Sequence, residues 1–250
     1  MDFYKILLKP VLLLFGLLII NGSESKNYSV STISFRNNTF DVFRADLNDV
    51  DIRFIWKDEE NNNFRNFNKA IKYFKKKEKK IVFATNGGMY DVNNAPLGLY
   101  IENGKVLVKL NRRRGGRGNF YLKPNGVFLI GADGAHIIEA NDFFKIKYKI
   151  KYATQSGPLL VYKNKIHPAF NEGSSNLYIR SGVGINNYGE TVFAISNEPV
   201  NFYDFALFFR DKLNCSNALY LDGAVSKMYL PDLNRYQILG NFGCMIVVLE

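Results

Sequence analysis

The 250 residues are 47% hydrophobic and 15% aromatic, which is enough apolar material for one sizeable core and excludes a disordered or low-complexity chain. The formal net charge of +10 favours contact with anionic polymers such as phosphorylated glycans, anionic lipid or nucleic acid. No helix-turn-helix, zinc-finger or aromatic RNA-binding pattern accompanies this charge, so we expect no nucleic-acid partner.

The N-terminus has the layout of a signal peptide. Lys5 and Lys9 precede an apolar run at residues 11–20, after which the residues become small and polar. This run is well short of the roughly 20 residues that cross a bilayer as a helix. We therefore predict that residues 1–25 are a signal peptide and that the protein is exported, either periplasmic or secreted. An uncleaved N-terminal membrane anchor is the alternative.

Residues 28–250 are predicted to form a single α+β domain, with a large, mostly antiparallel or mixed β-sheet flanked by a few helices. Apolar residues at steps of three and four predict helices at 64–74 and 202–213. Alternating or short apolar runs between turn residues predict strands at 28–35, 40–47, 52–56, 81–85, 97–102, 106–110, 126–130, 135–139, 158–162, 178–185, 192–196, 218–221 and 245–249.

Two segments carry much of the positive charge. Residues 72–80 (KYFKKKEKK) are predicted to be the solvated end of the first helix. Residues 112–119 (RRRGGRGN) lack the terminal Lys-Ser/Thr of a P-loop and are predicted to form a mobile basic loop. This loop either covers a cleft and attracts an anionic substrate, or is merely solvated.

Cys215 and Cys244 are the only cysteines in the chain. In an exported protein they could pair as a disulfide. They could equally be two buried thiols that act as small hydrophobic side chains.

Four strand-end segments are rich in glycine and polar residues. Loops at strand ends gather ligand-binding groups on a rigid scaffold, and glycine lets the backbone approach a ligand closely. We therefore predict that the four segments converge on one cleft. They are Asn86-Gly87-Gly88-Met89-Tyr90, Gln155-Ser156-Gly157-Pro158, Arg180-Ser181-Gly182-Val183-Gly184 and Leu221-Asp222-Gly223-Ala224-Val225-Ser226.

Six motifs in a fixed order give a resemblance to a known family. They are NGGMY (86–90), PLGLYIENGK (96–105), GNFYLKPNGVF (118–128), ATQSGPLLV (153–161), IRSGVGI (179–185) and ALYLDGAVSKMYLP (218–231). Together they resemble the phosphodiester glycosidase domain of N-acetylglucosamine-1-phosphodiester α-N-acetylglucosaminidase and its bacterial relatives, over roughly residues 35–249. The animal enzymes carry Asp-Gly-Gly-Gly-Ser in the last motif, whereas this chain has Ala224 and Val225 between Gly223 and Ser226, which is closer to the bacterial branch.

The resemblance implies hydrolysis of a glycosyl-1-phosphodiester, which releases a sugar and leaves a phosphomonoester on the acceptor. Such a reaction needs charge stabilisation on the phosphate oxygens and a carboxyl group at the anomeric carbon. Arg180 is predicted to clamp the phosphate, with a surface salt bridge as the alternative. Asp222 is predicted to be the catalytic carboxyl, with a structural turn as the alternative. The predicted substrate-binding residues are Asn86, Gly87, Gly88, Gln155, Ser156, Gly157, Gly223 and Ser226.

The sequence requires no cofactor and shows no metal site. His136, His167 and the two cysteines lack the spacing of a zinc cluster or a Ser-His-Asp triad, while a calcium or magnesium ion held by Asp and Asn oxygens is left open.

The expected partner is a phosphorylated glycan or sugar-phosphodiester substrate of the envelope or extracellular space, and a membrane only if residues 1–25 are retained. Two other functions stay open at this point. One is a non-catalytic module that binds phosphoglycans, and the other is a membrane-tethered structural protein.

Overall fold

The structure is a computed structural model that describes residues 26–222 and 225–250. The predicted signal peptide at 1–25 and the predicted site residue Gly223 lie outside the described residues. No helix in the described part of the chain is both long enough and apolar enough to cross a membrane.

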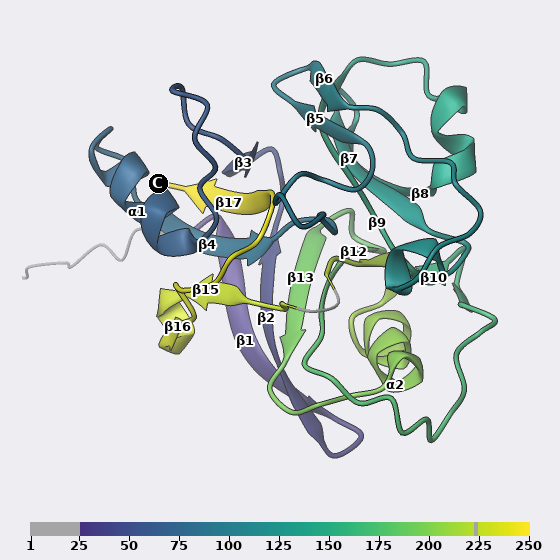
Figure 1. Cartoon of the computed structure of the whole chain (residues 1–250). Coiled ribbons are helices and arrows are strands. Elements are labelled where there is room, and N and C mark those ends of the chain that lie inside the picture. Colours follow the sequence, from purple (N-terminus) through teal and green to yellow (C-terminus); the bar gives the residue numbers. More distant parts are fainter. Residues whose placement is uncertain (1–25, 223–224) are drawn as a thin grey trace, which may run out of the picture.

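The described strands form three antiparallel sheets (Figure 1). The first has the order β1 (Tyr28–Phe35), β2 (Asn38–Ala45), β13 (Thr191–Ser196), β12 (Ser181–Asn186), β14 (Cys215–Tyr220), β10 (Leu159–Tyr162) and β11 (Lys165–Ile166). The second has the order β16 (Arg235–Tyr236), β15 (Met228–Leu230), β4 (Ile81–Asn86), β17 (Met245–Leu249) and β3 (Asp51–Ile55). The third has the order β6 (Lys105–Val108), β5 (Tyr100–Glu102), β9 (Ile150–Ser156), β7 (Gly126–Gly131) and β8 (Gly134–Glu139).

Two α-helices lie on the outer faces of these sheets. α1 (Phe67–Lys75) is capped by Asn66, whose Oδ1 accepts from the Lys69 N–H at 3.0 Å. α2 (Phe202–Leu207) runs into a π-helical turn, η3 (Phe208–Lys212). Short 3₁₀ turns complete the described structure at η1 (Asn119–Tyr121), η2 (Ala140–Lys145) and η4 (Pro231–Leu233).

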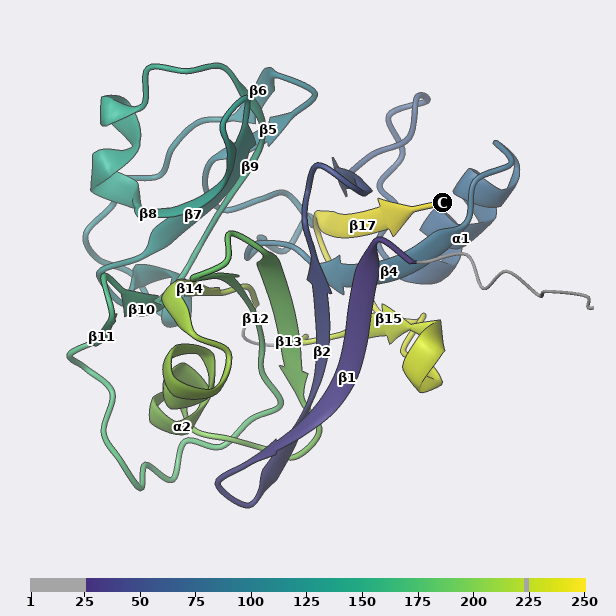
Figure 2. The same ribbon diagram turned by 180° about the vertical axis from the view of Figure 1, so that it is seen from behind.

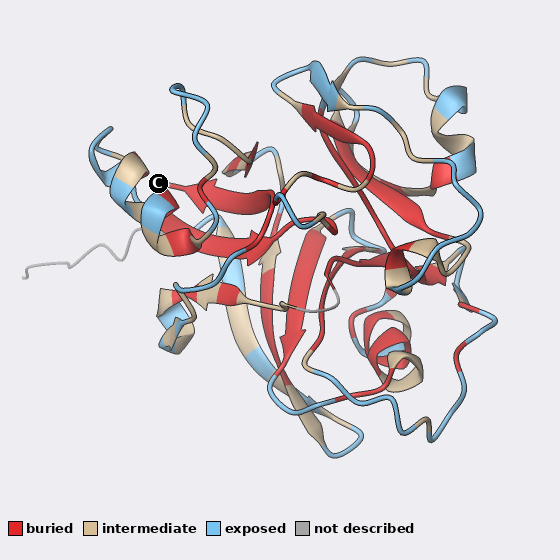
Figure 3. Ribbon diagram, viewed as in Figure 1, coloured by how far each residue is buried: buried red, intermediate tan, exposed pale blue. Residues whose placement is uncertain are grey.

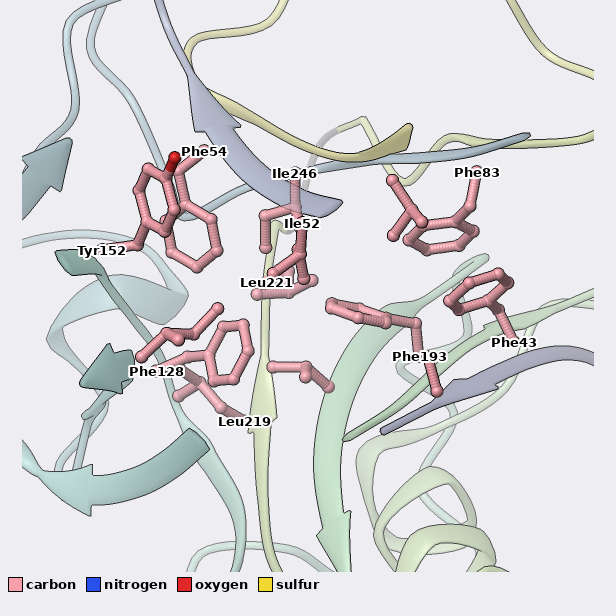
Figure 4. Packing of buried hydrophobic residues seen from close by; sticks show 14 of the residues in the cluster. Phe43, Ile52, Phe54, Phe83, Phe128, Tyr152, Phe193, Leu219, Leu221 and Ile246 are labelled. Carbon is pink, nitrogen blue, oxygen red and sulfur yellow. The ribbon is translucent and has the colours of Figure 1, made fainter. Parts of the chain in front are cut away.

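The largest apolar cluster lies where the three sheets meet (Figure 4). Phe43 of β2 stacks on Phe83 of β4 with ring centroids 4.2 Å apart, which joins the first sheet to the second. Phe128 of β7 packs edge-on against Phe193 of β13 at 5.9 Å, which joins the third sheet to the first. A core shared in this way makes the three sheets one packing unit.

Helices cover the opposite faces of the first and second sheets. Side chains alternate along β2 and β13, so that Val42 and Val192 face α2 while Phe43 and Phe193 face the shared core. Seen from behind, α2 lies against the first sheet (Figure 2). The apolar face of α1 packs on β4 and β17 in the same manner.

The predicted α+β class with mostly antiparallel strands is confirmed, although the strands divide among three sheets and do not form one large sheet. The first helix begins at Phe67 and not at 64, because Arg65 has a φ of +63° and Asn66 is the cap. Gly182 and Gly184 lie inside β12, within the predicted strand at 178–185, and not in a loop at its end. A Cβ at Gly184 would be 2.8 Å from the Phe209 ring, so the strand needs glycine there to accept the helical layer.

Cys215 and Cys244 are free thiols, so the disulfide alternative is wrong for this structure. Cys215 belongs to the cluster under α2, whereas Cys244 belongs to the core shared by the three sheets. Burial raises the pKa of each thiol to about 12. Both cysteines therefore act as small core side chains and not as reactive groups.

We expect mass-tagging to label two thiols in the denatured protein and almost none in the native protein, because burial blocks access and suppresses the thiolate. Cys215→Ser provides the control and should lower the denatured count to one. A denatured wild-type protein with no reactive thiol, purified without reductant, would show that the two cysteines are bridged.

Candidate active site

The four predicted segments meet where the three sheets join. β4 of the second sheet ends at Asn86, and β9 of the third sheet ends at Ser156. In the first sheet, Arg180 immediately precedes β12. The antiparallel strand β14 leads into Asp222 at the same end of the sheet. The structure thus brings segments that are far apart in the sequence to one place.

Side-chain hydrogen bonds hold these segments together. The Asn86 Oδ1 accepts from the Ser181 Oγ at 3.2 Å and from the Lys227 N–H at 3.0 Å. The Ser226 Oγ accepts from the Ser181 N–H at 3.0 Å and donates to the Asp222 carbonyl at 3.1 Å. Asn86 and Ser226, both predicted to bind substrate, therefore tie the second sheet to the loop that carries Asp222.

The predicted glycines allow this close approach. A Cβ at Gly88 would lie 2.4 Å from the Gln155 carbonyl oxygen, and one at Gly87 would lie 2.7 Å from the Cys244 Sγ. A Cβ at Gly157 would lie 2.6 Å from the Asn125 Cβ. Each glycine is thus required by packing between protein segments, whatever it contributes to substrate binding.

Gln155 and Ser156 use their polar atoms within the protein. The Gln155 Oε1 accepts from the N–H groups of Leu99 and Asn111 at 3.0 and 2.9 Å, and its Nε2 donates to the Asn111 carbonyl at 2.8 Å. The Ser156 Oγ donates to the Leu221 carbonyl. Gln155 is 1% exposed, so the structure shows it anchoring the basic loop that starts after Asn111. Direct contact of either side chain with substrate stays a prediction.

A pocket of about 440 Å³ opens beside this junction. Its polar lining comes from Tyr90, Arg117, Asn119, Asn176, Tyr178 and Asp222. Among the predicted site residues that the structure describes, Asp222 alone lines this pocket.

Asp222 is only 5% exposed and lies directly after β14. Burial, together with the Asp222 charge, raises the pKa of Tyr90 to about 12. The pKa of Tyr220 is also raised to about 12 by burial, and the Asp222 charge adds to that rise. Both phenols are therefore protonated at neutral pH, and the Tyr90 O–H donates to the Asn241 carbonyl at 2.9 Å, which fixes its ring in the pocket lining.

Arg180 lies behind the pocket wall and is 1% exposed. Its Nε donates to the Val200 carbonyl at 2.7 Å, and its Nη2 donates to the carbonyl and Oδ1 of Asn176 at 2.9 and 2.8 Å. The guanidinium stacks on Phe202 at 3.6 Å from the ring centroid. Among the described residues it forms no salt bridge, so the salt-bridge alternative is not what holds it.

The guanidinium therefore acts on the pocket through Asn176, which it holds and which lines the pocket. Burial lowers the pKa of Arg180, the direction expected for a cation removed from water. A direct two-point contact between Arg180 and a phosphate stays a prediction. It requires the guanidinium to release its hydrogen bonds to Asn176.

Sequence reasoning did not assign Asn119, Asn176 or Tyr178 to the site. Asn119 belongs to the basic loop and to the motif at 118–128, and Tyr178 begins a predicted strand, but only the fold brings them and Asn176 to Asp222. Arg117 belongs to the basic loop of residues 112–119, for which covering a cleft was one of two alternatives. Its place in the pocket lining favours that alternative.

Comparison with known proteins identifies the family of the chain. Residues 79–241 match the phosphodiester glycosidase family, and this range includes Asn86, Arg117, Arg180 and Asp222. The chain belongs to the phosphodiester glycosidase family. The resemblance inferred from the six motifs is thereby confirmed.

Three other proteins are similar to this phosphodiester glycosidase domain. The uncharacterized protein YigE of Escherichia coli K12 is 46% identical over 150 residues, which are 60% of this chain and 58% of YigE. The catalytic domain of zebrafish N-acetylglucosamine-1-phosphodiester alpha-N-acetylglucosaminidase, auto-inhibited by its pro-peptide, superposes with a TM-score of 0.63 at 16% identity. This match covers 91% of the present chain and 85% of the zebrafish domain.

A protein of Burkholderia pseudomallei K96243 described as exported superposes with a TM-score of 0.55 at 9% identity, over 85% of this chain and 74% of that one. At such low identities, the two structural matches establish the fold of this phosphodiester glycosidase domain and no more.

The described residues contain no group of three or more His, Cys, Asp and Glu side chains that could hold a metal ion. That finding does not extend to sites built from asparagine or backbone oxygens. A calcium or magnesium requirement therefore stays an open prediction.

Gln155→Leu removes the two hydrogen bonds that anchor Asn111 and the one to the Leu99 N–H, while nearly keeping the side-chain volume. We expect the protein to lose about 2 to 4 kcal/mol of stability, since three backbone groups lose their partner. Trypsin should cut faster between Arg112 and Arg117. Cleavage at the exposed Lys72 and Lys75 of α1 serves as the internal reference. Unchanged cleavage of the loop in a variant of unchanged stability would contradict the anchoring role.

Arg180→Lys keeps a positive charge but loses the fork on Asn176. We expect a loss of roughly 2 to 4 kcal/mol, because the buried Val200 carbonyl and the two Asn176 oxygens lose charged hydrogen bonds. Thermal unfolding measures this loss, and Arg65→Lys, at an exposed arginine, is the matched control. Equal melting temperatures for the two variants would rule out the buried hydrogen bonds as a source of stability.

Proposed function

We propose that this protein is an exported hydrolase that cleaves a glycosyl-1-phosphodiester in an envelope or extracellular glycan. One observation carries the proposal: the buried carboxyl group of Asp222 lines a pocket that also contains the cation of Arg117 and the amides of Asn119 and Asn176. The reaction needs this combination, because a carboxyl group assists cleavage at the anomeric carbon while donors stabilise the phosphate. Membership of the phosphodiester glycosidase family supports the same reaction.

In this proposal, water adds across the bond between the anomeric carbon and the phosphate oxygen. The sugar leaves with the new hydroxyl group, and the phosphate stays on the acceptor as a monoester. Asp222 serves as general acid or as nucleophile at the anomeric carbon. Arg117 and the amide of Asn119 face the charge that builds up on the leaving phosphate.

Arg180 contributes to this proposed reaction from behind the pocket wall. It fixes the carbonyl and Oδ1 of Asn176, which orients the amide group of Asn176 toward the pocket chemistry. Its buried charge also adds positive potential near the proposed phosphate position. Arg180 is thus a positioning residue in this scheme, and Asn176 and Arg117 are the groups that reach the substrate.

Export is part of the proposal and rests on two observations. The sequence of residues 1–25 has the layout of a signal peptide, and the structurally similar Burkholderia protein is described as exported. The match to YigE covers 58% of that protein, so the activity of the whole protein is part of the proposal.

Asp222→Asn should lower turnover of a GlcNAc-1-phosphodiester model compound by roughly a hundredfold or more, since proton transfer alone contributes about 10² to 10⁴. Release of free sugar measures turnover, and binding of the compound should change little. Asp49→Asn, at an exposed carboxylate, is the matched control and should retain full activity.

Both variants must melt at the wild-type temperature before the rates are compared, because Asp222 also belongs to the loop held by Ser226. A folded Asp222→Asn protein with near-normal turnover would remove Asp222 from the mechanism. A wild-type protein that binds sugar phosphodiesters but releases no sugar would instead identify a phosphoglycan-binding module.

A further inference from the structure

One of the two concentrations of positive charge lies on the third sheet and its connections, and the other is the lysine run at residues 72–80. Residues 100–152 contain eleven lysines and arginines and four aspartates and glutamates, a formal net of +7 out of +10 for the chain. The described acidic side chains nearby have other partners: Glu102 accepts from Tyr100, Asp133 pairs with His136, and Asp142 pairs with Lys145. The excess charge of this region is therefore not neutralised locally.

The segment from Arg112 to Arg117, here termed the arginine loop, carries four of these cations on its surface. Arg112, Arg113, Arg114 and Arg117 are exposed, and none of them forms a salt bridge with a described carboxylate. The part of the chain between β6 and η1 that spans residues 112–118 is accordingly pale blue in Figure 3. These arginines are available to an anionic ligand.

The arginine loop is held at both ends, which distinguishes it from a solvated tail. At its start, Gln155 binds both backbone groups of Asn111. Arg112 then lies over the exposed ring of Phe144 at 5.3 Å. At its end, Gly116 packs so close to the Tyr121 ring that a Cβ would lie 2.5 Å from it. The protein thus presents the arginines at a defined place.

Only the last arginine of the arginine loop reaches the pocket of Asp222. Arg117, its last arginine, lines the pocket, whereas Arg112, Arg113 and Arg114 lie outside the lining. A neighbouring hollow of about 220 Å³ shares Asn119 and Asn176 with the pocket and has no charged side chain in its lining. A single phosphodiester in the pocket can use Arg117, and the other three arginines need further phosphates.

We propose that the substrate is a polyanionic glycan with repeated phosphodiesters, and that the arginine loop binds the phosphates next to the one that is cleaved. This inference rests on the proposed function and names the class of its substrate. Fixed cations beside an active site raise the local concentration of an anionic polymer and guide it to the pocket. The uncharged hollow then receives the neutral part of the chain beyond the cleaved bond.

The triple variant Arg112→Gln, Arg113→Gln, Arg114→Gln tests the inference. The matched control is Lys69→Gln, Lys72→Gln, Lys75→Gln, which removes the same charge from exposed lysines of α1 that form no described salt bridge. The binding probe is a fluorescent poly(glycerol phosphate) oligomer, which has repeated phosphodiesters but no glycosyl phosphate bond. Three exposed ion pairs together predict a roughly tenfold weaker affinity for the arginine variant at low salt.

We expect the arginine variant to bind the oligomer about tenfold more weakly and with a smaller salt dependence, and the lysine variant to stay within about twofold of wild type. Turnover of the GlcNAc-1-phosphodiester model compound, which has one phosphate, should stay within about twofold in both variants. Failure of wild type to cleave that compound would overturn the proposed function. The binding result would still test whether the arginine loop binds repeated phosphates.

Three results would overturn the inference itself. One is equal affinity of wild type and the arginine variant for the oligomer. Another is an equal loss of affinity in the lysine variant, which would indicate a general charge effect. The third is tighter binding of a single-stranded DNA oligomer of the same charge than of poly(glycerol phosphate), which would identify a nucleic-acid surface.

Discussion

The architecture depends on one buried polar junction. The Asn86 amide oxygen on the second sheet accepts from Ser181 on the first, and Ser226 links Ser181 to the backbone of Asp222. From the third sheet, Ser156 donates to the carbonyl of Leu221. Buried polar groups are costly without partners, so each of these bonds constrains where the three sheets can meet. The pocket inherits its position from that constraint.

This junction separates residues that shape the site from residues that face the pocket. The side chains of Gln155, Ser156 and Asn86 form hydrogen bonds within the protein. Arg117 and Asn176 instead line the pocket and come from irregular segments. Asp222 belongs to both groups, because it follows a buried strand and lines the pocket. A rigid junction under exposed loops lets substrate contacts change while the carboxyl group stays in place.

The cations near the pocket also fall into two groups, one buried and one exposed. Arg180 is a buried cation that is compensated by carbonyl groups, the Asn176 amide oxygen and the face of Phe202, without a described carboxylate. The arginine loop holds its cations in water, where each contributes little alone and several act together on an anionic chain. The buried charge acts at short range on the pocket wall, and the exposed charges act at longer range on arriving ligands.

The sequence by itself determined the α+β class, most strands and the family, because these follow from local periodicity and from motifs around strand ends. It did not reveal β9, whose inner residues Thr154, Gln155 and Ser156 are polar yet buried between β5 and β7. Nor did it reveal that Gln155 serves the arginine loop, or that Arg180 holds Asn176. Those roles depend on which segments become neighbours in space, and only the packing of three sheets around one junction decided that.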